Sequence, residues 1–412
     1  MQSLMILGRQ PALGLAELES IYGAEKIRPV GEKAAIVGVD PCLLAFDRLG
    51  GSVKFCKILT ELDTTDLKEI ERFLVKVSPS HSQSMPEGKM RLGLSAIGLK
   101  TSGGHLNSAG LALKKAIRRT GRNVRVIPNK SLELNAAQVL HNQLTGETGW
   151  ELYLIRDGDR TIVAQTVKVQ DIEAYSKRDR GRPERDPRVG MLPPKLAQII
   201  VNLAAGELPA DKLQDICDIP AGEPVPRPIL GKTVLDPFCG TGVLLQEALL
   251  MGYDIAGSDL EPRMVDYTVQ NLAWLEDAFG LPARTYDITV ADATDHKWQK
   301  SVDFVASEAY LGRPFTSRPS AEVLERTVAD CNLIIKKFLG NIHGQLASGT
   351  RLCLAVPAWQ TAPREFRHLP LIDQISALGY NRISFERSRD EDLVYYRKDQ
   401  IVARQLLVIT RK

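Results

Sequence analysis

The sequence predicts an α/β protein in which a doubly wound parallel sheet forms the carboxy-terminal half and smaller α+β units precede it. Three short apolar segments support this prediction, and each runs into an acidic residue: Thr233–Asp236, Tyr253–Asp259 and Ile288–Asp292. An apolar helix pattern begins soon after the first of them, at Val243. Apolar strands that alternate with helices are typical of a parallel sheet with helices on both faces.

The remaining elements of this half fit the same sheet. We expect a fourth strand at Val302–Ala306 and a fifth at Thr350–Val356, with a helix from about Ala321 to Leu339 between them. Leu393–Arg397 and Arg404–Ile409 are expected to form a terminal antiparallel hairpin. The sheet is therefore predicted to close with antiparallel strands.

The segment after the first strand is a glycine-rich turn, Asp236–Gly242. Gly240 and Gly242 have no Cβ atom, so the backbone there can turn sharply and approach a ligand closely. The spacing differs from the G-x-G-x-x-G pattern that places a helix N-terminus under a pyrophosphate. The turn therefore predicts a cradle for a nucleotide-like cofactor other than a dinucleotide.

The seven residues Asp-Pro-Phe-Cys-Gly-Thr-Gly of this turn resemble the cofactor motif of class I S-adenosylmethionine-dependent methyltransferases that act on exocyclic amino groups of nucleobases. The resemblance implies that S-adenosylmethionine is the cofactor and that the turn lies beside its methionine moiety. It also implies a seven-stranded class I methyltransferase sheet. The expected cofactor-binding residues are Asp236, Phe238, Cys239, Gly240, Thr241, Gly242, Asp259, Leu260, Asp292 and Ala293.

Two of these acids have expected roles of their own. Asp259 follows the turn by about twenty residues, where a carboxylate can accept hydrogen bonds from both ribose hydroxyls. The resemblance implies that Asp292 accepts from the adenine amino group. Acids at strand ends also serve as helix caps, and that alternative stays open for each of them taken alone.

The catalytic element is expected directly after the fourth strand. Methyltransferases of amino groups carry the pattern D/N-P-P-Y there, because an acceptor must bind the N–H groups of a poorly nucleophilic amine and stabilise the positive charge that develops. An aromatic ring then stacks on the base. This chain departs from the pattern and reads Ser-Glu-Ala-Tyr-Leu-Gly over residues 307–312, without the proline pair.

Two registers relate this segment to the pattern. An ungapped count from Asp303 places Glu308 in the acidic position, with Tyr310 able to stack from an adjacent position. A shift by one residue pairs Ser307 with the acid and Tyr310 with the aromatic residue. We prefer the first register because it keeps a carboxylate at the strand end and Gly312 in its usual place. Glu308, Tyr310 and Ser307 are the candidate catalytic residues.

Positive charge is concentrated in the middle of the chain. Residues 89–195 contain 20 Lys and Arg against 10 Asp and Glu, although the whole chain has a net charge of only +3. A concentrated positive face is typical of proteins that bind nucleic acids, although charge runs are also common on solvated surfaces. A predicted helix over 107–120 carries four of these cations. The candidate RNA-binding residues are Lys114, Lys115, Arg118, Arg119, Arg178, Arg182 and Lys195.

The amino-terminal half is expected to hold two units. Residues 1–84 predict a small α+β unit with a strand at Ser3–Leu7 and a helix at Leu13–Ile21. Residues 85–172 predict a second unit, which includes a hairpin of Glu151–Ile155 and Thr161–Ala164 across an Asp-Gly-Asp turn. The layout of the second unit, together with the phrase Gln165–Tyr175, resembles a THUMP RNA-binding domain, and the first unit looks like its ferredoxin-like companion.

A linker and leading helix are expected over residues 173–230, and the cofactor-binding domain over 231–412. The linker string R-D-x-G-R-P and the following M-L-P-P-K-L-A resemble the corresponding region of THUMP-containing guanine N2-methyltransferases. By that resemblance the segment folds over the cofactor. Arg178, Arg182 and Lys195 are therefore also candidates for contacts with a carboxylate or a phosphate.

Over nearly its full length the chain resembles THUMP-containing tRNA guanine N2-methyltransferases, most closely those that act at position ten. The resemblance implies methyl transfer to a guanosine N2 amino group of tRNA, with a small activating protein subunit as an optional partner and a monomer otherwise. Two alternatives stay open. One is an amino methyltransferase of ribosomal RNA or DNA, and the other is a non-catalytic RNA-binding protein with a vestigial pocket.

Composition narrows the class of protein further. The six cysteines are scattered and form no C-x-x-C pair, so we expect neither a disulfide framework nor a metal site. Cys239 is interpreted as a small apolar residue of the turn. The first residues lack a basic lead before an apolar core, and no run is long enough to span a membrane. We therefore expect a cytoplasmic protein without a membrane partner.

Overall fold

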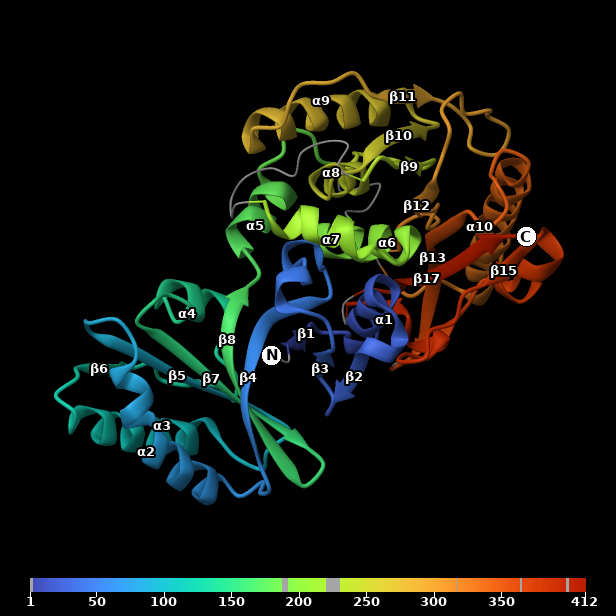
Figure 1. Cartoon of the computed structure of the whole chain (residues 1–412). Helices are drawn as coiled ribbons and strands as arrows, with labels where there is room; N and C mark the ends of the chain where they lie inside the picture. The colour runs from blue at the N-terminus through green and yellow to red at the C-terminus, as the bar shows by residue number, and fades with distance from the viewer. Residues whose placement is uncertain (1–2, 187–191, 220–229, 316, 364, 398–399) are drawn as a thin grey trace. The chain divides into compact units, whose positions relative to one another are not determined.

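The structure is a computed structural model that describes residues 3–186, 192–219, 230–315, 317–363, 365–397 and 400–412 (Figure 1). The chain forms two compact units. Unit 1 takes in Glu25–Asp47, Ser52–Ile172 and the chain up to Pro11, and unit 2 takes in Ala12–Ala24, Arg48–Gly51 and everything from Glu173 onward.

Unit 1 is built on one eight-stranded sheet with the strand order β2-β3-β1-β4-β8-β7-β5-β6. Its strands are β1 Ser3–Leu7, β2 Ile27–Val30, β3 Ala34–Val37, β4 Ser52–Leu62, β5 Met90–Ile97, β6 Val124–Val126, β7 Gly149–Asp157 and β8 Arg160–Val169. Its main helices are α2 Leu67–Gln83, α3 Gly103–Arg118 and α4 Ala136–His141. Burial alternates from residue to residue over Ser52–Lys57 of β4, because successive side chains of a strand point to opposite faces of the sheet.

Local signals in the sequence explain several of these elements. Asp66 and Ser102 accept backbone N–H groups at the starts of α2 and α3, and Asn135 forms a capping box at α4. The predicted hairpin is confirmed: Asp157 pairs with Arg160 across a two-residue turn whose Gly158 has φ +63°. The strand expected at Ser3–Leu7 also forms as predicted.

The strands of the two predicted amino-terminal domains belong to a single sheet. Strand β4, from the first predicted domain, pairs antiparallel with β8, from the second. A buried ion pair also joins the two predicted domains: Lys54 Nζ, on β4, lies 2.7 Å from Glu151 Oε1, on β7. Ser95 and Thr166 also donate to the Glu151 carboxylate, at 2.6 and 2.7 Å. The predicted boundary after residue 84 thus coincides with no break in the sheet, and it stays a prediction.

Unit 2 is built on a nine-stranded sheet whose main path is β11-β10-β9-β12-β13-β17-β15. Its strands are β9 Thr233–Asp236, β10 Asp254–Asp259, β11 Asp287–Val290, β12 Phe304–Glu308, β13 Arg351–Ala362, β14 Glu365–Arg367, β15 Tyr380–Arg382, β16 Val394–Tyr395 and β17 Val402–Arg411. Its helices are α1 Pro11–Tyr22, α5 Ile172–Arg180, α6 Pro194–Ala205, α7 Ala210–Cys217, α8 Val243–Leu250, α9 Pro262–Phe279 and α10 Ala321–His343, of which α1 and α5 each begin on one residue of unit 1.

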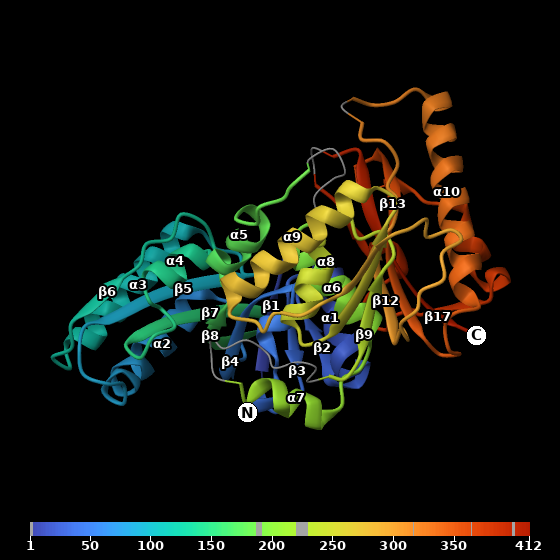
Figure 2. The same ribbon diagram turned by 90° about the horizontal axis from the view of Figure 1, so that it is seen from above.

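This sheet is doubly wound, as the sequence predicted. Strands β9 to β13 run parallel, and β17 is antiparallel between β13 and β15. Figure 2 shows α6, α8 and α9 on one side of the sheet and α10 on the other. Seven strands form the main path, and the short strands β14 and β16 pair at its margin with β13 and β17. The expected terminal hairpin forms, because β16 pairs antiparallel with β17.

The order of the strands reverses its direction next to β9. From β9 the chain winds in one direction through β10 and β11, and it then crosses to β12 and β13 on the other side. Ligands of doubly wound sheets bind outside the carboxyl ends of the strands at such a switch point. The turn that follows Asp236 lies at this point of the sheet.

Contacts assign helix α1 to unit 2, although the sequence grouped it with the amino-terminal domain. The Glu17 carboxylate is buried and accepts from Gly50 N at 2.9 Å and Gly51 N at 2.8 Å. Asn202 of α6 donates to the same carboxylate at 2.8 Å. Arg48 continues the network, since its Nη2 donates to the Tyr253 hydroxyl at 2.9 Å.

The segment predicted as a linker and leading helix is described in part. Helix α6 begins at Pro194 after an N-cap at Pro193, which agrees with the expected prolines in its first turn. Helix α7 lies in the same predicted segment, after the leading helix, where the sequence analysis named no further helix. Residues 187–191 and 220–229 of the predicted linker lie outside the described residues. Among the helices that the structure describes, none combines the length and apolar character that crossing a bilayer requires.

Candidate cofactor and catalytic site

Two glycines of the turn have backbone conformations that other residues avoid. Gly240 has φ +52° and Gly242, the N-cap of α8, has φ +79°. A Cβ atom on Gly242 would lie 3.0 Å from the Thr268 side chain, so α9 packs directly on this position. A Cβ atom on Gly240 would meet no atom within 4 Å, which leaves open space beside the turn. The glycine-rich turn is thus shaped as the sequence predicted.

Helix α9 fixes the turn through side chains that the sequence analysis missed. Thr268 Oγ1 donates to the Gly240 carbonyl at 2.8 Å, and Asn271 Nδ2 donates to the Thr241 carbonyl at 2.8 Å. Both side chains are buried. The only sequence signal for these two contacts is that Thr268 and Asn271 are polar residues on the otherwise apolar face of an amphipathic helix. Phe238 packs its ring edge-on against Phe338, with centroids 5.2 Å apart.

Cys239 is a buried part of the turn. Its N–H donates to the Ser258 carbonyl at 2.9 Å, and burial raises the pKa of its thiol well above the ordinary value. A thiol in this state carries no thiolate at neutral pH. Its place therefore agrees with a packing residue. All six cysteines are free in the structure.

Asp259, the predicted ribose ligand, lies at the carboxyl end of β10 beside the turn. Its Oδ2 accepts from Gly240 N at 2.9 Å, and its Oδ1 accepts from Glu261 N at 3.0 Å. Each carboxylate oxygen can accept a second hydrogen bond, so these contacts orient the group without exhausting it. Burial raises the pKa of this carboxyl group. The next residue, Leu260, is 64% exposed, and it offers an apolar surface next to the carboxylate.

Asp292 lies in a turn just past β11. The sequence predicted that the strand reaches this acid, but β11 ends at Val290 because the chain turns where Asp292 Oδ1 accepts from Thr294 N at 2.9 Å. That hydrogen bond lowers the pKa of the exposed carboxylate. Ala293 is buried, and its carbonyl accepts from Asn341 Nδ2 at 3.1 Å.

Asp236 is buried at the end of β9 and links the turn to the fourth strand. Its Oδ1 accepts from Ser307 Oγ at 2.6 Å and from Phe238 N at 3.2 Å. Ser307 is fully buried, so its hydroxyl is committed to the cofactor turn. This arrangement disfavours the register in which Ser307 takes the acidic position. Burial raises the pKa of Asp236 to about 7.

The raised pKa of Asp236 predicts a pH dependence of stability. The Asp236 carboxyl group binds its proton more tightly in the folded protein than in the unfolded chain, where it ionises near its ordinary pKa of 3.8. Its contribution to stability is therefore fully present below about pH 4 and is lost as the pH rises through about 7. Asp236→Asn cannot ionise, and we expect it to flatten the decline of the urea midpoint over this window. Parallel pH profiles for the variant and the wild type would contradict the prediction.

Glu308 ends strand β12, and Arg404 of the antiparallel strand β17 binds it. Arg404 Nε donates to Glu308 Oε1, and both side chains are largely buried, with 7% and 16% exposure. No local sequence pattern predicts this ion pair, because its partners are 96 residues apart. Tyr310 follows on the loop and is 39% exposed, so its ring is accessible for stacking. Gly312 has φ +83°, and a Cβ atom there would lie 2.7 Å from Thr327.

The three cations of the linker region have different surroundings. Arg182 is buried against the turn, where its Nη1 donates to Thr241 Oγ1 at 2.9 Å. Arg178 is also buried, and its Nε donates to Glu247 Oε1 at 2.6 Å. The predicted contact of Arg178 with RNA does not fit this position, because an internal carboxylate already neutralises the guanidinium. Lys195 Nζ lies 4.8 Å from the centre of the Tyr175 ring, and burial lowers its pKa.

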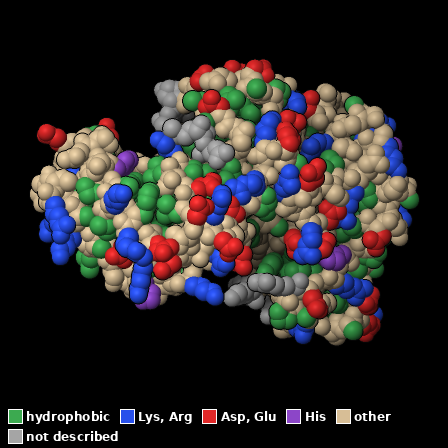
Figure 3. Space-filling view, turned by 60° about the horizontal axis from the view of Figure 1, so that its bottom comes forward, with side chains coloured by type: hydrophobic (Ala, Val, Ile, Leu, Met, Phe, Trp, Pro, Cys, Tyr) green, Lys and Arg blue, Asp and Glu red, His purple; other side chains and the backbone are tan. Residues whose placement is uncertain are grey.

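The other predicted RNA-binding residues lie in unit 1, on the last turns of α3. Lys114 is half-buried there, and Lys115, Arg118 and Arg119 are exposed. Figure 3 shows Lys and Arg side chains gathered over the end of this unit that carries α3 and β6. Within the described ranges, no group of three or more His, Cys, Asp or Glu side chains is placed to hold a metal ion.

The doubly wound sheet with a glycine-rich turn at its switch point defines the class I methyltransferase fold, which the sequence predicted. Two solved structures agree. TrmN from Thermus thermophilus matches with a TM-score of 0.53 and 14% identity over 100% of both chains. SMU.472 complexed with SAH matches with a TM-score of 0.50 and 12% identity, over 98% of this chain and 97% of that one. At these identities the likeness establishes the fold.

A sequence relative is more specific. The chain is 29% identical over 201 residues to the tRNA (guanine(10)-N2)-dimethyltransferase of Methanothermobacter thermautotrophicus, and the match spans 48% of each chain. The chain thus spans about half of the length of this curated relative, and less of another from Pyrococcus abyssi that bears the same name, of which it matches 39% at 27% identity. No model of a known protein family matches the chain.

Proposed function

We propose that the chain is an S-adenosylmethionine-dependent methyltransferase that modifies the N2 amino group of a guanosine in tRNA, at position ten. The observation that carries the proposal is a set of acidic residues at the carboxyl edge of the unit 2 sheet, beside one glycine-rich turn. Asp236, Asp259 and Glu308 end three neighbouring strands, and Asp292 lies just past a fourth. The name of the relatives supports the substrate, and the fold supports the class of reaction.

The residues around the turn fit the cofactor. Arg182 reaches the turn with its Nη1, while its Nε and Nη2 are buried without a hydrogen-bond partner in the described structure. Buried N–H groups without an acceptor are costly, and a carboxylate such as that of the methionine moiety would accept from these two nitrogens. Open space beside Gly240 and the exposed Leu260 leave room for the nucleoside. In one solved structure of the same fold, SMU.472, the protein is complexed with SAH.

We assign the following roles to the residues that hold the reactants. Asp259 would bind the ribose hydroxyls, Asp292 the adenine amino group, and Arg182 the carboxylate. When bound, the cofactor supplies an electrophilic methyl group on its sulfonium. The chain's own contribution is to bind the cofactor and the target base in a reactive orientation. The reaction then takes place between two bound groups and needs no bimolecular encounter.

Glu308 and Tyr310 would act on the target base. The guanine amino group is a poor nucleophile because its lone pair is delocalised into the ring. A carboxylate oxygen of Glu308 that accepts its N–H draws the nitrogen toward a tetrahedral geometry and stabilises the positive charge that develops as the new N–C bond forms. Tyr310 would stack on the base after it leaves its helix. The surplus proton then passes to Glu308 or to bulk water.

A second candidate function has one specific observation in its favour. Arg404 neutralises part of the charge on Glu308, and the usual proline pair is replaced by Ala309 and Tyr310. A carboxylate that is already paired stabilises an incoming positive charge less well. The chain would then be an RNA-binding protein that keeps a cofactor pocket without transferring methyl groups.

One experiment separates the two candidates. Purified protein is incubated with methyl-labelled S-adenosylmethionine and total tRNA, and the nucleosides are analysed by mass spectrometry. The proposed function predicts label in N2-methylguanosine or N2,N2-dimethylguanosine, which accumulates far more slowly when Glu308→Gln protein is used. Cofactor binding without label in any nucleoside would leave the non-catalytic candidate, and label in ribosomal RNA or DNA alone would redirect the substrate.

A further inference from the structure

Unit 1 contains a hollow of about 380 Å³ on its surface, at the edge of the eight-stranded sheet. It lies where the last turns of α3, the segment before β5 and the edge strand β6 meet. The lining residues are Lys89, Lys114, Arg118, Asn123, Val124 and Arg125. Four of these six side chains are cationic and none is acidic, so the hollow is strongly positive.

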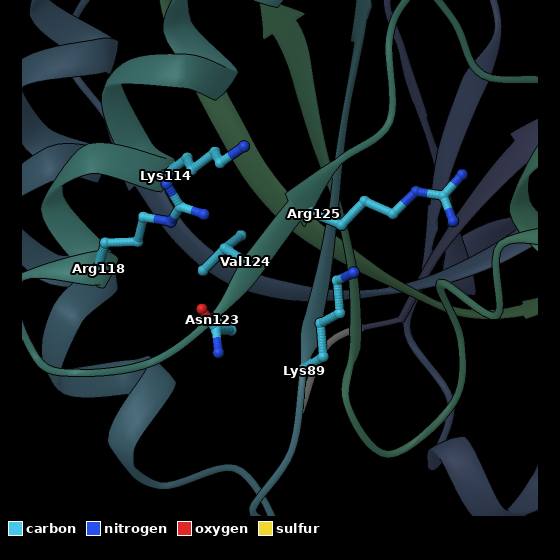
Figure 4. Close-up of a pocket in the computed structure, with 6 residues that line it drawn as sticks. All are labelled: Lys89, Lys114, Arg118, Asn123, Val124 and Arg125. Carbon is cyan, nitrogen blue, oxygen red and sulfur yellow. The ribbon is translucent and has the colours of Figure 1, made fainter.

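The arrangement of the side chains concentrates this charge. Figure 4 shows Lys114 and Arg118 side by side on the helix, with their charged ends turned toward β6. Lys89 approaches from the opposite side, and Val124 lies between them. Arg125 extends from the strand away from the helix and so extends the positive surface past the sheet edge. Val124 is 3% exposed and closes the floor.

The cations of the hollow have no internal partner among the residues that the structure describes. In the described parts of the chain, no ion pair or side-chain hydrogen bond is formed by Lys89, Lys114, Arg118 or Arg125. Their neighbour Arg122 is different, because its guanidinium donates to backbone carbonyls that include that of Met85 at 3.2 Å. Arg122 therefore holds the fold together, whereas the four lining cations contribute no such contact.

Local energetics also point to an external anion. Lys114 and Arg118 are four residues apart on α3, and like charges at that spacing destabilise a helix. The helix dipole favours cations in the last turn, and this offsets part of the cost. It does not account for Lys89 and Arg125, which lie outside the helix and line the same hollow.

We propose that this hollow binds a phosphate group of RNA, either a phosphodiester within the strand or the terminal phosphate at the 5′ end. This proposal rests on the proposed function, which makes RNA the partner. Lysine ammonium groups bind phosphate as point charges, and arginine offers a fork of donors that matches phosphate oxygens. A concave site of this size accepts one phosphate with its attached sugar, whereas a flat basic face would follow a duplex.

The test compares charge reversal inside and outside the hollow. Lys114→Glu and Arg118→Glu remove two converging cations, and Lys76→Glu on the exposed face of α2 makes the same charge change on another helix of the unit. Binding of total tRNA is measured by filter retention at several salt concentrations. We expect each hollow variant to weaken binding by about tenfold and to reduce the salt slope by about one, while the control changes affinity less than about twofold.

A second arm identifies the source of the phosphate. Wild-type protein is titrated with tRNA that carries a 5′ phosphate and with the same tRNA after phosphatase treatment. Equal affinities mean that the hollow holds a phosphodiester of the strand. A loss on dephosphorylation that matches the loss in Lys114→Glu, without a further loss when the two are combined, means that it holds the terminal phosphate.

The outcomes also separate this proposal from the proposed function. Wild-type-like tRNA binding by both hollow variants, with melting curves unchanged, would overturn the phosphate site even if methyl transfer is observed. Failure of the wild type to bind RNA at all would overturn it too. Conversely, a hollow-dependent affinity in a protein that transfers no methyl group would support the site and remove the enzymatic proposal. In an active enzyme the variants should raise KM for tRNA and leave kcat unchanged.

Discussion

Glu308→Gln is expected to lower the rate of methyl transfer to tRNA by about a hundredfold to a thousandfold. The amide keeps an oxygen that can accept from Arg404 but lacks the negative charge that would stabilise the developing ammonium. Binding of S-adenosylmethionine should be unchanged, because the proposed role of Glu308 is to contact the target base and not the cofactor. Single-turnover rates and calorimetric titrations of the same preparation measure the two effects separately.

The choice of glutamine matters because of the buried ion pair. Glu308→Ala would leave Arg404 buried without its carboxylate, and breaking a pair in this way costs about 3–5 kcal/mol of stability. A loss of activity in that variant would then reflect unfolding as well as chemistry. A Glu308→Gln protein that folds normally and keeps the wild-type rate would remove Glu308 from its proposed role.

Asp259→Ala is expected to weaken S-adenosylmethionine binding by about a hundredfold or more. Each hydrogen bond to a charged group contributes about 1.5–3 kcal/mol, and the carboxylate would bind two ribose hydroxyls. The substitution also frees Gly240 N, which now donates to Asp259 Oδ2 at 2.9 Å, so the turn loses one of its supports. Isothermal titration measures the change in Kd.

Asp254 provides a matched control on the same strand. It lies at the opposite end of β10, where it forms an exposed ion pair with Arg284 at 3.5 Å. Asp254→Ala should therefore leave the cofactor affinity within about twofold of the wild type, since exposed pairs contribute little. Equal losses in the two variants would mean that Asp259 acts through general stability and has no contact with the ribose.

The local features of the cofactor site were predictable from the sequence. The glycine-rich turn, the strand that ends at Asp236 and the acid at Asp259 depend on short-range rules: glycine for positive φ, apolar runs for strands, and helix patterns directly afterwards. The sheet followed from the same alternation of strands and helices. Their assigned roles toward a ligand stay predictions that the titrations above test.

Contacts between distant segments were not predictable. Arg404 reaches Glu308 because β17 pairs antiparallel with β13. The sequence predicted antiparallel strands at this end of the sheet, but no local pattern specifies their register. Glu17 binds Gly50 and Gly51 and ties α1 to unit 2 by the same kind of long-range contact. The distribution of charge along the sequence likewise could not predict the surroundings of Arg178. Composition does not distinguish an exposed cation from one that is paired with a buried acid such as Glu247.

The proposed function depends on one site in unit 2, formed by the glycine-rich turn and the Asp259 carboxylate that is hydrogen-bonded to it. Its most direct test is a calorimetric titration of the purified chain with S-adenosylmethionine and with its demethylated product. We predict saturable binding of both compounds with one site per chain, lost in Asp259→Ala and retained in Asp254→Ala. Absence of measurable binding of either compound to the folded wild-type protein would contradict the account.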